Sequence, residues 1–149
     1  PPRSTLFPYT TLFRSRSVKT RTDLVESIMS NEETLDDILK NLLASIPEVQ
    51  AAAIVSVEGL PIASALPAEA DETRIAAMTA AILSLGERAA QELGKGTLEQ
   101  VFVRGQSGYI LTMSAGPNAV LTISTTKDIK LGLVFLDTKR TCDKIAKLV

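Results

Sequence analysis

The chain has 149 residues, of which 45% are hydrophobic and 22% charged, a composition typical of one soluble globular domain. Histidine is absent and Cys142 is the only cysteine, so a Ser–His or Cys–His catalytic pair, a zinc site built from histidines or several thiolates, and an intrachain disulfide are excluded within one chain. A net charge of −1, 4% aromatic residues and the lack of a long apolar run argue against nucleic-acid binding and direct membrane insertion, and the single cysteine predicts a cytoplasmic location.

Residues 1–28 are predicted to be an artefactual or disordered N-terminal extension. Residues 5–15, TLFPYTTLFRS, match the in-frame translation of a common DNA-sequencing adapter along their whole length. Met29 is then the expected start of a domain that runs over 29–149, and the alternative is a genuine basic arm. Removing the five basic and two acidic residues of 1–28 from the totals of 16 and 17 leaves 11 and 15, so the domain carries a net charge of −4.

The domain is expected to begin with a helix and a β-hairpin. Ser30 or Thr34 can cap a helix whose apolar residues recur at helical spacing until Pro47 ends it. The apolar run Ala51–Val57 predicts a buried strand, and a Glu-Gly-Leu-Pro turn leads into a second strand, Ile62–Leu66.

A long helix, three short strands and a final helix are predicted to follow. Asp71 caps the long helix, which continues to about Leu93, where glycines stop it. The strands are expected over Leu98–Arg104, Tyr109–Ser114 and Ala119–Ser124. Their connections are too short for crossover helices, which predicts an antiparallel meander. The last helix begins after Lys127-Asp128.

The resulting order, α-β-β-α-β-β-β-α, predicts an α/β protein of the α+β type with a five-stranded antiparallel sheet. The strands are apolar on both faces, as where Ile54 adjoins Val55 and Phe102 adjoins Val103. Helices are therefore expected on both faces of the sheet, with the long middle helix alone on one of them.

The middle helix has more apolar surface than packing on a sheet requires. One stripe is predicted to face the sheet: Ile75, Met78, Ile82, Leu85, Ala89 and Leu93. The opposite side carries Ala76, Ala80, Leu83 and Ala90 beside Ser84, and these small residues would let a second helix approach closely. The alternative is that the alanines are simply good helix formers.

The strand over Leu98–Arg104 is apolar on both sides, which at a sheet edge would be a liability without a partner. Pairing with its own copy in a two-fold dimer would satisfy the free backbone groups. The expected dimer interface is therefore Ala76, Ala80, Leu83 and Ser84 from the helix, with Leu98, Gln100, Val101, Phe102 and Val103 from the strand.

Three stretches resemble the roadblock/dynein light chain family: Ile46–Ser64 (IPEVQAAAIVSVEGLPIAS), the alanine-rich helix after Asp71-Glu72, and Lys130–Leu148 (KLGLVFLDTKRTCDKIAKL). The resemblance covers residues 34–149 and is nearest to the short prokaryotic members. It implies a roadblock/profilin-like fold and a homodimer, or a heterodimer with another roadblock protein, built through the third strand and second helix. It also implies a Ras-like small GTPase as partner, and hence a non-enzymatic scaffold that anchors or activates the GTPase.

Arg74, Arg88 and Arg104 are the arginines near the expected surface and are candidate GTPase contacts. An arginine finger is one hypothesis for them. The alternative is that they are solvated or paired with neighbouring glutamates, while the dimer holds the GTPase switch loops in a hydrolysis-competent arrangement.

A small-molecule sensor of the PAS or profilin-like type is the rival function. Such a sensor needs a cavity with converging polar groups, and the expected core positions here are aliphatic. The sequence predicts no catalytic residue, metal ligand or cofactor-binding residue.

Overall fold

A computed structural model describes residues 33–149. The extension 1–28, the expected start at Met29 and the possible cap Ser30 lie outside the described residues. The elements are α2 (Leu35–Ser45), β1 (Val49–Ser56), β2 (Pro61–Ala65), α3 (Glu72–Glu92), β3 (Val101–Gly105), β4 (Gly108–Ser114), β5 (Ala119–Thr125) and α4 (Leu131–Ala146). The predicted order is confirmed, and the one boundary that moves by several residues is the start of β3.

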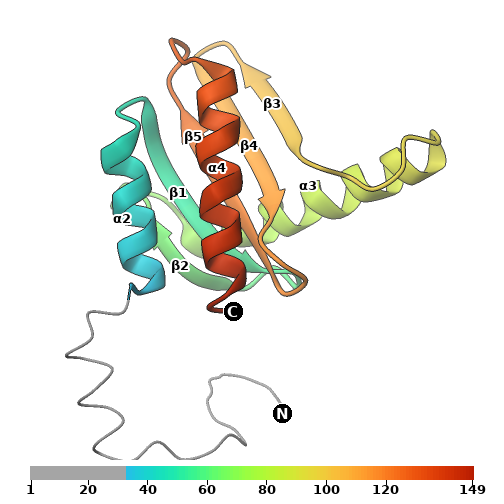
Figure 1. Cartoon of the computed structure of the whole chain (residues 1–149), viewed down its shortest axis with the longest axis horizontal. Coiled ribbons are helices and arrows are strands. Elements are labelled where there is room, and N and C mark those ends of the chain that lie inside the picture. Colours follow the sequence, from blue (N-terminus) through green and yellow to red (C-terminus); the bar gives the residue numbers. More distant parts are fainter. Residues whose placement is uncertain (1–32) are drawn as a thin grey trace, which may run out of the picture. The chain divides into compact units, whose positions relative to one another are not determined.

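All five strands form one antiparallel sheet in the order β2-β1-β5-β4-β3 (Figure 1). The predicted meander of β3, β4 and β5 is confirmed. The central strands β1 and β5 are buried along most of their length, as a sheet covered on both faces requires. β2 and β3 are the two edges, so the inferred edge position of the third strand is also confirmed.

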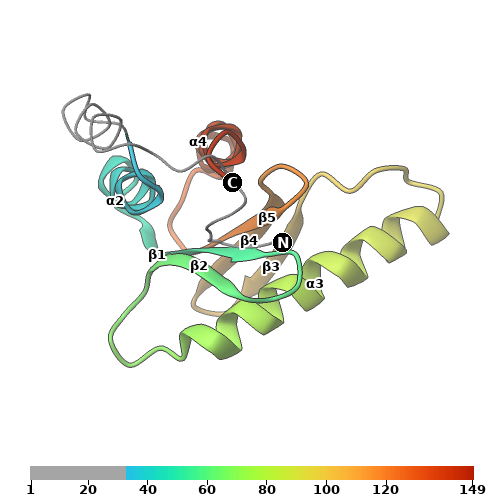
Figure 2. The same ribbon diagram turned by 90° about the horizontal axis from the view of Figure 1, so that it is seen from below.

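Helices cover both faces of the sheet, and α3 is alone on its side (Figure 2). The larger core cluster lies between the sheet and the pair α2 and α4, and its fully buried members include Leu39, Leu121 and Ile145. The smaller cluster lies under α3. The predicted division of three helices into two and one is therefore confirmed.

Thr34 caps α2 through a reciprocal pair of hydrogen bonds. The Asp37 backbone N–H donates to the Thr34 hydroxyl oxygen, and the Thr34 N–H donates to the Asp37 carboxylate, each over 3.1 Å. These bonds, the one from the Thr34 backbone first, lower the pKa of Asp37. Thr34, the second of the two possible caps that the sequence offered, is therefore the N-cap of α2.

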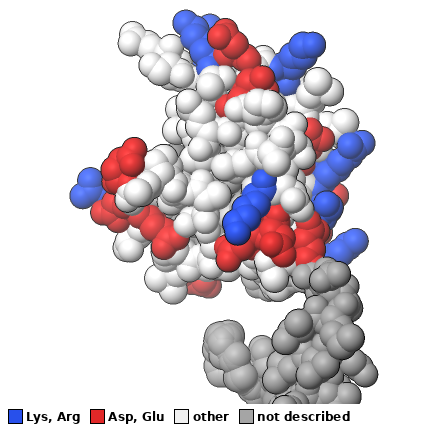
Figure 3. Space-filling model, turned by 90° about the vertical axis from the view of Figure 1, so that its left-hand side faces the viewer, with Lys and Arg blue, Asp and Glu red and all other residues white. Residues whose placement is uncertain are grey.

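The side of the domain that faces the viewer in Figure 3 carries charges of both signs. On the side shown in Figure 3, basic side chains are scattered among acidic ones around a broad uncharged area. No single-sign surface of the kind that attracts a polyanion is visible there.

We expect Gly108→Ala to lower the free energy of unfolding by about 3 kcal/mol. Gly108 has φ of 154°, and a Cβ at this position would collide with the carbonyl oxygen of Thr125 on β5. Gly94→Ala is the matched control, because Gly94 also has positive φ (70°) but has no atom within 4 Å of an added Cβ. The control should cost only about 1 kcal/mol in urea denaturation, and equal losses would contradict the steric argument.

Candidate interaction surface

α3 packs on the sheet through Ala76, Thr79 and Leu83, none of which belongs to the stripe that was predicted to face the sheet. Ala76 is fully buried, and Leu83 is 5% exposed. Met78 and Leu85, which were expected to face the sheet, are 50% and 64% exposed. The prediction that Ala76, Ala80, Leu83 and Ala90 form an outward face is therefore wrong.

The size of the side chains explains which stripe is buried. Ala76 and Leu83 share a cluster with Ala53, Val55 and Val120 of the central strands. The hairpin turn also comes close to the helix, since a Cβ added to Gly59 would lie 3.5 Å from the Cα of Ala77. Small residues permit this close approach, whereas the larger residues of the other stripe would hold the helix away from the sheet.

The start of β3 is shifted by a second close contact with α3. Leu98 and Val101 lie against Gly86, where an added Cβ would meet the Val101 side chain at 2.7 Å. Leu98 and Val101 thereby join the core cluster under α3. Leu98 and Gln100 are half-buried and precede the strand, so their predicted place in an exposed edge strand is wrong.

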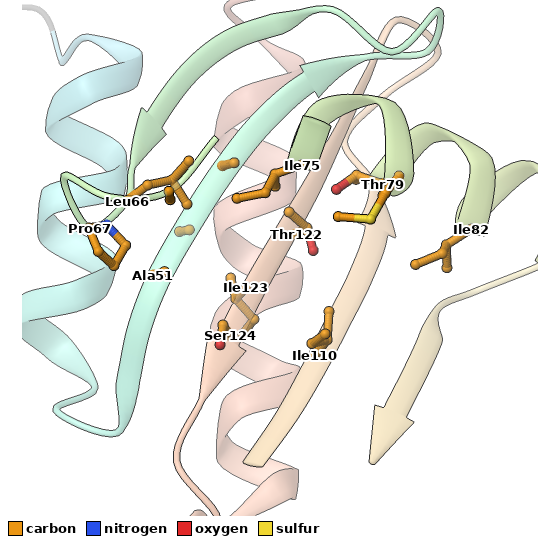
Figure 4. A pocket seen from close by; sticks show the side chains of 14 residues that line it. Ala51, Leu66, Pro67, Ile75, Thr79, Ile82, Ile110, Thr122, Ile123 and Ser124 are labelled. Carbon is orange, nitrogen blue, oxygen red and sulfur yellow. The ribbon is translucent and has the colours of Figure 1, made fainter. Parts of the chain in front are cut away.

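An apolar groove of about 390 Å³ opens between α3 and the sheet. Ile75 and Ile82 of α3 point toward it, and Ile110 and Thr122 form its floor (Figure 4). The Thr122 hydroxyl is already hydrogen-bonded to that of Thr112 over 3.1 Å. The groove thus offers aliphatic surface with few free polar groups.

Beside this groove, one corner of the sheet is bare on the α3 side. Val103 of β3 pairs with Ile110 of β4, and their side chains are 38% and 40% exposed. α3 crosses the sheet obliquely, and its last turns run out beyond β3 (Figures 1 and 2). The corner therefore lacks a covering helix, while the end of the helix lacks a sheet beneath it.

The hairpin geometry also determines which residues of β3 point their backbone N–H and C=O groups outward at the free edge. Gly105 and Gly108 flank a two-residue loop, so the backbone groups of this pair are hydrogen-bonded to each other. The same holds for every second pair along the hairpin, such as Val103 with Ile110. Phe102 and Arg104 consequently turn their backbone N–H and C=O groups outward. The predicted edge residues Phe102 and Val103 are both exposed.

The three candidate arginines are exposed, and two of them share one face of α3. Arg74 and Arg88 lie, with Leu85, on the side of the helix away from the sheet. The Arg74 Nε lies 3.9 Å from the Asp71 carboxylate, a solvent-exposed pair of little energetic value. Among residues 33–149, Arg88 and Arg104 form no ion pair. The Glu72 carboxylate, one of the suggested partners, accepts a hydrogen bond from the Ser64 hydroxyl.

Ala80, Ser84 and Cys142 are not among the residues that line the groove. Ser84 is exposed and Ala80 is half-buried, and both line a small pocket beside Val57 and Glu87. Burial raises the pKa of the Cys142 thiol to about 12, which keeps it protonated. In the described part of the chain, no three His, Cys, Asp or Glu residues are grouped so as to hold a metal ion, and no helix is long and apolar enough to cross a membrane.

We expect Leu83→Ala to lower the free energy of unfolding by about 2–4 kcal/mol, because it leaves a cavity under α3. Leu85→Ala deletes the same atoms from the exposed face and should cost less than about 0.5 kcal/mol at low protein concentration. Urea denaturation at two protein concentrations measures both effects. The decrease in the free energy of unfolding caused by Leu83→Ala should be the same at both concentrations. A larger loss for Leu85→Ala at low concentration would reverse the face assignment.

The chain is similar to known proteins in sequence and in fold. Residues 35–125 match the family model described as the Roadblock/LC7 domain. An uncharacterised protein of Methanocaldococcus jannaschii is 38% identical over 97 residues, which are 65% of this chain and 84% of that protein. A second one from this organism is 34% identical over 114 residues, 76% of this chain and 95% of the relative.

Solved structures share the fold. The Roadblock/LC7 domain from Streptomyces avermitilis superposes with a TM-score of 0.71 at 19% identity, covering 76% of this chain and 95% of that one. Myxococcus xanthus MglB gives 0.70 at 23% identity, covering 76% and 93%. Profilin II of Acanthamoeba castellanii gives 0.58 at 17% identity, covering 77% and 98%. The predicted roadblock/profilin-like fold is confirmed, and the chain belongs to the Roadblock/LC7 domain family.

Proposed function

We propose that this protein is a non-enzymatic, dimerising regulator of Ras-like small GTPases that acts in the cytoplasm. The observation that carries the proposal is the open β3 edge, which borders the bare apolar corner around Val103 and Ile110. An exposed edge beside exposed aliphatic side chains is a site for another chain. The partner subunit is a second copy or another roadblock protein.

A two-fold axis perpendicular to the sheet at Val103 would both pair the free backbone groups of β3 and cover the exposed corner at Val103 and Ile110. It brings the outward backbone groups of Phe102 opposite those of the partner's Arg104, which extends the sheet across both subunits. The same rotation carries the overhanging end of each α3 across the axis. The partner's Leu93 and its neighbours then cover the bare corner at Val103 and Ile110, which supports this symmetry over other arrangements.

The dimer would set the two α3 helices side by side. Ile75, Ile82 and Ala89 lie on the flank of α3 that borders the groove, so they replace Ala76 and Leu83 in the proposed helix–helix interface. Phe102 and Val103 remain in the proposed interface. The outer face of the helix pair then presents Leu85 with the arginines Arg74 and Arg88, which is the surface proposed to contact the GTPase.

Family membership supports the choice of a GTPase as the partner. An aliphatic face with exposed cations suits the binding of a folded protein through a few anchors. Because Arg74 has a carboxylate beside it and the surface is open to water, we propose that the dimer holds the GTPase switch loops in place and does not supply an arginine finger.

The groove volume of about 390 Å³ also suits a small apolar ligand, which keeps the sensor of PAS or profilin-like type as a second candidate. Thr79 and Thr122 are among its few polar lining groups, and Thr122 is already paired. The oligomeric state separates the two functions. A protein that stays monomeric at high concentration by light scattering would favour the sensor.

Arg104→Pro should weaken the dimer about 100-fold, because it removes an outward N–H from each subunit at the proposed seam. The bonds from β3 to β4 are left intact, since Arg104 does not bond inward. Arg104→Ala is the control and should dimerise nearly as the wild type does. Sedimentation equilibrium gives both constants, and equal constants for Pro and Ala would contradict pairing through β3.

Single-turnover GTP hydrolysis by Ras-like GTPases from the same genome tests the regulatory role. We expect stimulation that is lost with Arg104→Pro and reduced less than about tenfold by Arg74→Ala or Arg88→Ala, because a finger would be worth about 1,000-fold. Lys40→Ala on α2 serves as the control. Failure of every such GTPase to bind in either nucleotide state would refute the GTPase partnership.

A further inference from the structure

The face of β3 opposite α3 carries a second exposed surface. Phe102, Tyr109 and Phe135 are the aromatic residues of the described chain, and they meet here. The Phe102 ring stacks on Tyr109 with 5.1 Å between centroids and meets Phe135 of α4 edge-on at 6.0 Å. Phe102 remains 39% exposed within this group. We call these three residues the aromatic shelf.

Among the described helices, neither α2 nor α4 lies over the β3 part of the shelf, which holds Phe102. Neither α2 nor α4 has a Cα atom within 8 Å of a Cα atom of β3, and Figure 1 shows β3 uncovered to one side of α4. Tyr109 and Phe135 are half-buried, and Phe135 lies in the second turn of α4. The shelf is therefore open on the side that faces away from α4. Aromatic side chains at such a site bury a large area when a partner chain lies on them.

Two cations border the shelf. Arg104 lies two residues after Phe102 and so projects from the same face of β3. Lys139 lies one helical turn after Phe135 and therefore on the β3-facing flank of α4. Both are exposed, and neither forms an ion pair among residues 33–149. The shelf thus has an apolar surface with two exposed cations beside it that form no ion pair within residues 33–149, in a domain of net charge −4.

The proposed β3-paired dimer turns the two shelves into one groove. α4 packs over β5 and β4 in each subunit, so the two α4 axes would be separated by about four strand spacings, or about 19 Å. A single helix between them needs about 16–20 Å, since packed helix axes lie 8–10 Å apart. The groove therefore has the width of one helix and an aromatic floor from both subunits.

We propose that this groove binds one amphipathic helix of a partner protein, with an aliphatic face on the aromatic shelves and acidic residues toward Arg104 and Lys139. The site lies on the opposite side of the sheet from the proposed GTPase face. It rests on the dimer of the proposed function but not on the identity of the GTPase. The protein would then join a GTPase on one face to an acidic helical segment on the other.

The test uses a synthetic 18-residue amphipathic helix with leucines along one face and glutamates beside them, titrated into the full chain by calorimetry. We expect one peptide per dimer. A peptide with glutamine in place of each glutamate should bind at least tenfold more weakly, because the charge attraction is lost. Binding should also fall at least tenfold with Lys139→Glu or Phe135→Ala, and a lysine peptide should restore binding to Lys139→Glu. Lys40→Glu, on α2 beyond α4, is the charge-matched control and should bind as the wild type does.

Light scattering on the same samples separates a failure of the helix site from a failure of the β3 dimer. A dimer that does not bind the glutamate peptide, that binds the glutamine peptide equally well, or that is unaffected by Lys139→Glu overturns the helix site and leaves the proposed function standing. A monomeric wild-type protein overturns the β3 dimer and this groove together.

Discussion

The close contact between α3 and the two central strands is the constraint on which the rest of the surface depends. Ala76 and Leu83 fit against Ala53, Val55 and Val120 because the side chains at this contact are small enough for the helix to lie near the sheet. Burying this stripe forces the bulkier stripe of the same helix outward or into the groove. The surface offered to partners is therefore a consequence of how the monomer fills its own core.

The uncovered corner of the sheet and the overhanging end of α3 are complementary features, and each of them would lower the stability of an isolated subunit. The oblique path of α3 leaves Val103 and Ile110 uncovered at one corner and carries the end of the helix past β3. In the proposed dimer, a second subunit would cover the uncovered corner and pack against the free helix end, both of which lie beside the open strand edge. Leu98 and Val101, held against Gly86, fix how far the helix end stands from that edge.

The two faces of the sheet differ in the chemistry that they present near β3. The α3 face is aliphatic, with arginines on the outer side of the helix. The other face carries the aromatic group of Phe102, Tyr109 and Phe135 with Arg104 and Lys139 beside it. Because β3 contributes alternate residues to both faces, pairing at this edge would build two composite surfaces at once. A small domain could in this way bind two different proteins.

The sequence alone determined the order of elements and the antiparallel meander, because these depend on local spacing, turn residues and short connections, and its resemblance to a known family indicated the family. It offered both Ser30 and Thr34 as caps of the first helix and did not decide between them. It also led to the inference of an edge position for β3, which the sheet order confirms, and it predicted α3 as a helix with two apolar stripes. Which stripe faces the sheet was decided only by the tertiary structure, and the prediction was wrong, since periodicity gives the angle between Leu83 and Leu85 but not the shape of the surface opposite them. That shape comes from alanines on β1 and a glycine turn distant in sequence, and the same long-range packing against Gly86 moved the start of β3.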